Sequence, residues 1–145
     1  MAKLSRRKTP TMRKLFSVIC LSASLAAMAW AAADEAKFVA AMKKIGPTCS
    51  GLGKKIKAKD ASGAADAKEL QGLFKESDKF WKAKKADDAI AHSKTAGTEF
   101  AAIHKAINSG DWDAADAGFK KAVATCGGCH GAHREKNADG TFKIK

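Results

Sequence analysis

The sequence has few of the residues that interrupt helices. Only two prolines occur in 145 residues, and tyrosine is absent. Alanine, the strongest helix former, is abundant, and apolar residues recur at spacings of three and four. The aromatic residues, 7% of the chain, are not interleaved with the lysines as they are in proteins that stack nucleic-acid bases. The composition therefore predicts an all-α protein and gives no sign of nucleic-acid binding.

Acidic residues are missing from the first 33 positions. This stretch opens with basic residues, continues as an uncharged apolar run from Leu15 to about Met28, and ends with three alanines at 31–33. That order is typical of a secretory signal peptide. We therefore predict a signal peptide over residues 1–33, with cleavage near its last alanine, and a mature domain over residues 34–145 in the periplasm.

Other interpretations of this segment remain open. Residues 15–33 are just long enough to span a bilayer as an uncleaved anchor. Cys20 could mark a lipoprotein site, although the bulky Ile19 precedes it, and Arg6-Arg7 is only a fragment of a twin-arginine signal. Cleavage leaves 21 basic and 15 acidic residues, a net charge of +6, and no stable membrane insertion. A basic surface of this size can steer a protein toward an acidic partner.

The mature part divides into amphipathic segments separated by short turns. The apolar periodicity predicts four helices, over about 35–57, 64–84, 87–108 and 112–136. Four helices with short connections predict an antiparallel four-helix bundle. The last residues, 137–145, carry no packing pattern and are predicted to be a frayed tail.

Several residues mark the expected helix ends. Pro47 falls inside the first segment and should kink it. Ser62 is a plausible N-cap for the second helix. Gly110 suits the position just after the third helix, and Asp111 suits the N-cap of the fourth.

The most informative motif lies in the fourth segment. Cys126 and Cys129 are followed directly by His130, which is the C-x-x-C-H pattern of covalent c-type haem attachment. Each thiol can add across one haem vinyl group to form a thioether, and the adjacent imidazole is then held beneath the iron as the proximal ligand. A zinc site or a redox-active dithiol is the alternative, but His130 and His133 are the only nearby extra donors, and no strand precedes the pair.

Two stretches resemble a known family. The motif reads Thr125-Cys126-Gly127-Gly128-Cys129-His130-Gly131-Ala132-His133-Arg134, with an arginine four residues after the histidine. The first helix contains Met42-Lys43-Lys44-Ile45-Gly46. Both stretches resemble the class II cytochromes c, the group of cytochrome c-556 and cytochrome c′. The usual aromatic residue before the arginine is a histidine in this chain, His133.

The resemblance implies a four-helix bundle with one covalent haem c, bound by the last helix and covered by the first. Met42 would then be the distal iron ligand opposite His130, and Arg134 would lie beside that proximal histidine. A methionine at this position implies the six-coordinate, low-spin c-556 type. An open distal site, with Met42 as core packing, would instead imply a five-coordinate, gas-binding cytochrome c′. Homodimers are common in the family.

The sequence thus favours an exported electron carrier that exchanges single electrons with a redox partner protein, and a gas-binding module is the alternative. Enzyme activity is not expected, because no distal histidine and arginine pair suited to cleaving an O–O bond is found. His92 and His104 are alternative sixth ligands. Cys49 falls on the apolar seam of the first helix, where it is expected to be buried, although an intersubunit disulfide is also conceivable.

Overall fold

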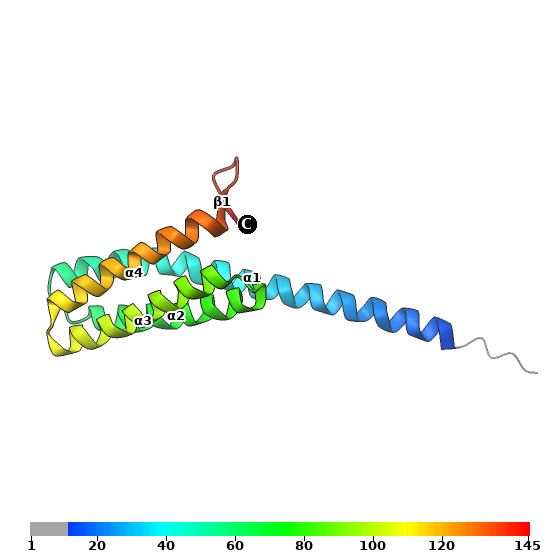
Figure 1. Ribbon diagram of the computed structural model, residues 1–145, viewed down its shortest axis with the longest axis horizontal. Coiled ribbons are helices and arrows are strands. Elements are labelled where there is room, and N and C mark those ends of the chain that lie inside the picture. The colour runs from blue at the N-terminus through cyan, green and yellow to red at the C-terminus, as the bar shows by residue number, and fades with distance from the viewer. Residues whose placement is uncertain (1–11) are drawn as a thin grey trace, which may run out of the picture. The chain divides into compact units, whose positions relative to one another are not determined.

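The computed structural model describes the backbone of residues 12–145 and the side chains of residues 34–145 (Figure 1). The chain divides into two compact units, Met1–Ala36 and Lys37–Lys145. The predicted signal peptide belongs to the first unit; its residues 1–11 lie outside the described residues, and the backbone is helical from Met12 on. None of the helices in the described part of the chain is both long and apolar enough to cross a membrane.

Four helices account for most of the chain: α1 (Met12–Lys57), α2 (Gly63–Lys84), α3 (Asp87–Ser109) and α4 (Trp112–His133). Within the second unit, the last part of α1 packs with the other three helices around an apolar core, and successive helices run in opposite directions (Figure 1). The predicted four-helix bundle is therefore confirmed.

The core consists of two clusters that together extend along the second unit. The larger cluster joins all four helices through aliphatic and aromatic side chains, among them Leu52, Leu70, Phe100, Ile103 and Ala122. The smaller cluster contains Phe38, Phe80, Trp81 and Ala89. Met42 is half-buried and packs against both clusters. A buried hydrogen bond between the hydroxyls of Ser77 and Ser93, 2.9 Å long, joins α2 to α3.

The helix ends agree with most of the predicted boundary signals. Gly110 follows α3 with a φ of 75°, a left-handed conformation that suits glycine. The side chain of Asp111 caps α4 by accepting a hydrogen bond from the backbone N–H of Ala114. Ser62 occupies the N-cap position of α2, as predicted, but its side chain makes no cap hydrogen bond. Instead, its own N–H donates to the carboxylate of Asp60.

The C-terminal residues differ from the prediction. The fourth helix ends at His133 rather than Lys136, and the tail is not frayed. Strand β1 (Arg134–Lys136) pairs antiparallel with β2 (Phe142–Ile144), with Arg134 opposite Ile144. A turn at Asp139 and Gly140 closes this hairpin, and its two strands are also joined by the Arg134 guanidinium, which lies 3.3 Å from the ring centre of Phe142. This cation–π contact gives the tail an ordered partner that the sequence pattern does not reveal.

Candidate functional site

The C-x-x-C-H motif lies on the last turns of α4, where the helix has lost its tight packing. The buried residues of α4 are Ala115, Gly118 and Ala122, all in its first half. Beyond Ala122, the side chains of Cys126 and Cys129 are half-buried, and His130 is exposed. The helix that carries the motif therefore borders an open space rather than the core.

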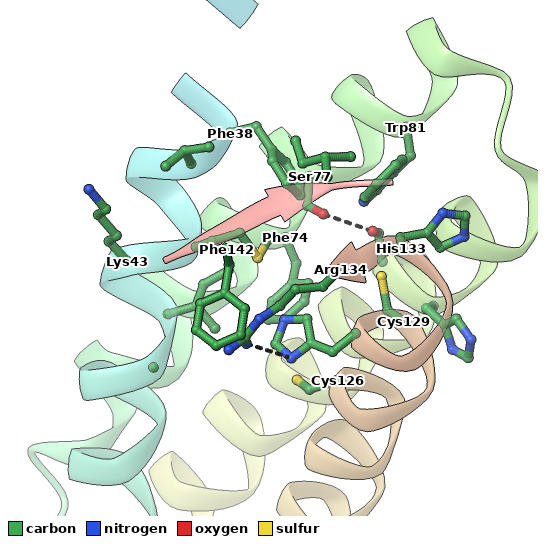
Figure 2. A pocket seen from close by; sticks show the side chains of 18 of the residues that line it. Phe38, Lys43, Phe74, Ser77, Trp81, Cys126, Cys129, His133, Arg134 and Phe142 are labelled. Carbon is green, nitrogen blue, oxygen red and sulfur yellow. Dashed lines mark hydrogen bonds between the residues drawn. The ribbon is translucent and has the colours of Figure 1, made fainter. Parts of the chain in front are cut away.

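That space is a cavity of about 630 Å³, within the size range of pockets that bind small molecules. Side chains from all four helices and from β1 and β2 line it (Figure 2). All five residues that the sequence singled out as cofactor-binding line this one cavity: Met42, Cys126, Cys129, His130 and Arg134. These five residues bring two thiols, one imidazole, one thioether and one guanidinium to the cavity.

The packing of α1 against α4 supports placing Met42 opposite His130. A Cβ added at Gly53 would lie 2.9 Å from Cζ of Phe119, so the two antiparallel helices are in close contact at this level. Met42 lies eleven residues before Gly53, and His130 lies eleven residues after Phe119, which is roughly 16 Å along each helix. The two predicted ligands are therefore at about the same level of the bundle, one on α1 and the other on α4.

Arg134 lies beside the imidazole of His130. Its Nη1 is 3.5 Å from Nδ1 of His130, on the outer limit of a hydrogen bond, while its guanidinium stacks on Phe142 (Figure 2). The pKa of His130 lies below its ordinary value, chiefly because neighbouring atoms remove part of the imidazole from water although the residue as a whole is exposed, and secondly because of the positive charge of Arg134. Both effects favour the neutral imidazole, which is the form that can donate a lone pair to a metal.

His133 stands where the family that the sequence resembles usually has an aromatic residue. In this chain the histidine has a definite role in the packing. Its Nε2–H donates to the carboxylate of Asp88, 2.7 Å away at the start of α3. Its ring lies 4.8 Å from that of Trp81 on α2. The end of α4 is therefore fastened to both α2 and α3.

His92 is a cavity residue whose contact with the motif could not be deduced from the sequence. A Cβ added at Gly128 would lie 2.8 Å from Cε1 of His92, so the glycine inside the motif permits this imidazole to approach α4 closely. His92 also lines the cavity. The other alternative ligand, His104, is not among the residues that line the cavity, and its Nδ1 lies 2.8 Å from the carbonyl oxygen of Ala64.

Three thiols border the cavity, and burial favours the neutral form of each. Burial, and to a smaller extent the nearby Cys126, raises the pKa of Cys49 to about 12. Burial likewise raises the pKa of Cys126 and of Cys129. This environment does not stabilise the thiolate form on which zinc binding and dithiol exchange depend. Among residues 34–145, no group of three or more histidine, cysteine or acidic side chains is placed to hold a metal ion.

The cavity has a charge of one sign and an apolar rim. The lysines and arginine that line it are Lys43, Arg134 and Lys143, and no acidic residue is among the lining residues. The large apolar side chains that remain exposed among the described residues, Val39, Val123 and Phe142, all lie on this cavity. These features suit an apolar, anionic occupant.

Comparisons with known protein families, with curated proteins and with solved structures found no match for this chain.

Proposed function

We propose that the protein is an exported c-type haem protein that carries single electrons, with the low-spin His/Met ligation of the cytochrome c-556 type. The observation that carries this proposal is that both motif cysteines, His130 and Met42 line one cavity, with Met42 and His130 at the same level of the bundle. The proposal also draws on the resemblance of the two sequence stretches to the class II cytochromes c. A periplasmic location follows from the predicted signal peptide.

The residues of the cavity fit a haem in chemistry and in number. Cys126 and Cys129 would each hold it through a thioether, and His130 and Met42 would each donate a lone pair to its iron. When bound, the haem supplies an iron that gains and loses one electron. The fixed helices keep both donor atoms in place during that change, and the apolar lining limits the entry of water. Rigid ligation of this kind suits electron transfer to and from a partner protein.

A second candidate is a five-coordinate, gas-binding protein. The observation that favours it is that Met42 packs against both core clusters, as an ordinary core methionine would. In that case the thioether fills space and leaves the distal side open to nitric oxide or carbon monoxide. The two candidates share the same cysteines and the same proximal histidine, so they differ only in the role of Met42.

Optical spectra of the purified haem protein distinguish these candidates. We expect a low-spin spectrum with the weak long-wavelength band of methionine bound to ferric iron, little changed by carbon monoxide. Met42→Ala should abolish that band and allow carbon monoxide to bind. Val39→Ala is the matched control, because Val39 lies on the same helix and lines the same cavity but offers no sulfur. A high-spin wild-type spectrum that Met42→Ala leaves unchanged would refute the electron-carrier assignment in favour of gas binding.

The attachment and export parts of the proposal have separate tests. Replacing Cys126 and Cys129 by alanine should leave haem that acidified organic solvent extracts from the protein, whereas the wild-type haem should resist extraction. The mass of the secreted protein should correspond to a chain that begins near Asp34 and carries one haem. A secreted protein without bound haem would exclude the proposed function altogether.

A further inference from the structure

Trp81 is the most deeply buried large side chain on the α2 wall of the cavity. It is only 3% exposed, and it packs in the smaller core cluster with Phe38 and Phe80. Its ring also contacts His133, three residues after the proposed proximal ligand. Figure 2 shows its ring nitrogen turned toward the side of the pocket where the sulfur of Cys129 lies. Trp81 therefore lines the cavity with its apolar ring and places a buried polar group next to it.

The indole N–H of Trp81 has no acceptor. Its Nε1 is buried, and no hydrogen-bond partner for it exists among the described side chains and backbone atoms. A buried donor without a partner is costly, and such groups in folded proteins are nearly always paired with protein or with a bound molecule. Because Trp81 lines the cavity, an occupant of that cavity could supply the missing acceptor.

The charges around the cavity indicate which kind of acceptor fits. Lys43, Arg134 and Lys143 reach it from α1, β1 and β2, and no carboxylate of the protein lines it. Lys143 is partly offset by Glu135 at 3.3 Å, but that pair is exposed on both sides and therefore weak. A cationic lining and a buried N–H donor together select a ligand oxygen that bears negative charge.

We propose that Trp81 is a cofactor-binding residue whose indole N–H donates a hydrogen bond to a carboxylate of the tetrapyrrole bound in the cavity. This inference rests on the proposed haem function. Under this inference α2 fixes the orientation of the macrocycle, although it contributes no iron ligand or thioether. Lys43, Arg134 and Lys143 contribute to the same recognition through their charge.

The test compares two porphyrins that differ only in their carboxylates. The mature chain with both motif cysteines replaced by alanine is titrated with zinc protoporphyrin and with its dimethyl ester, and the porphyrin absorbance reports binding. The diacid should bind more tightly than the diester. In Trp81→Phe, which keeps the ring but removes the donor, this preference should fall by about tenfold, the effect of a lost hydrogen bond to a charged group. Trp112→Phe is the control, because Trp112 lies outside the cavity.

An unchanged preference in Trp81→Phe would overturn the inference while leaving the haem function intact. If the wild-type chain carries no covalent haem and the alanine variant binds neither porphyrin, the proposed function itself has failed. If the alanine variant does not fold, the haem-attached wild type decides. Its ferrous, carbon monoxide-treated form should show a nuclear Overhauser contact between the Trp81 indole proton and a propionate methylene. An indole proton that contacts only protein protons would again overturn the inference.

Discussion

Gly53 determines how closely α1 approaches α4, and a single methyl group should test that packing. A Cβ at this position would lie 2.9 Å from Cζ and 3.0 Å from Cε1 of Phe119. Real Cβ atoms do not approach carbon this closely, so Gly53→Ala must move the Phe119 ring or separate the helices. The same substitution at Gly72, on α2, meets nothing within 4 Å and provides the control.

The expected magnitude combines two opposing effects. Alanine in a helix interior is favoured over glycine by about 0.5–1 kcal/mol, and this gain applies at both sites. Overpacking typically costs about 1–3 kcal/mol, and it applies only at Gly53. Gly72→Ala should therefore stabilise the protein, and Gly53→Ala should be less stable than Gly72→Ala by about 1–3 kcal/mol.

Urea unfolding of the two variants, followed by far-UV circular dichroism, measures this difference. In a Phe119→Leu background, which removes the outer ring atoms, Gly53→Ala should regain the stabilisation seen for Gly72→Ala. Under the proposed haem function, Gly53→Ala should also weaken the methionine charge-transfer band to the extent that it separates the helices that carry Met42 and His130. If Gly53→Ala stabilises as much as Gly72→Ala with Phe119 present, the inferred contact and the helix register based on it are wrong.

Three further predictions concern the surroundings of the motif. Gly128→Ala should be less stable than Gly127→Ala by about 1–3 kcal/mol in urea, because only the first meets His92, and equal stabilities would contradict that contact. The pKa of Asp88 is lowered mainly by its hydrogen bond with His133. This contact therefore stabilises the folded state at pH values above the ordinary carboxyl pKa, and the stabilisation is lost as the pH falls through the lowered pKa of Asp88. Asp88→Asn should therefore reduce stability at neutral pH and change it little in acid. Its neighbour Asp87→Asn should keep the wild-type dependence of stability on pH. Urea unfolding at a series of acidic pH values measures both, and an Asp88→Asn variant that also keeps the wild-type dependence would contradict the prediction. Burial is the main cause that raises the pKa of Cys49 to about 12. Iodoacetamide at about pH 8 should therefore alkylate this thiol at least tenfold more slowly in the folded haem protein than in urea. Similar rates would mean that the thiol is accessible.

The sequence predicted the bundle well because its signals are local. The spacing of apolar residues defined α2 and α3 almost to the residue, and the glycine and aspartate between α3 and α4 have the capping roles expected of them. The grouping of Cys126, Cys129 and His130 follows from their adjacency on one helix. Met42 lines the same cavity although it lies far away in the chain.

What the sequence did not reveal depends on contacts between distant segments. The β1–β2 hairpin has strands of three residues, too short for an alternating pattern, and its cation–π contact joins Arg134 to Phe142 across the turn. The approach of His92 to Gly128 depends on the relative rotation of α3 and α4, which no single-helix pattern encodes. The unpaired N–H of Trp81 is visible only once its surroundings in the fold are known.

The weak packing of the second half of α4 has a consequence for the order in which the protein matures. The bundle core is complete as far as Ala122, so the helices can assemble while the cysteines beyond it still border open space. An enzyme that attaches a cofactor to these thiols could then reach them in a largely folded chain. Attachment of a haem would then add to the contacts that His133 already makes with α2 and α3, and a chain that misses it should keep its helices but be cleaved more readily by proteases near the C-terminus.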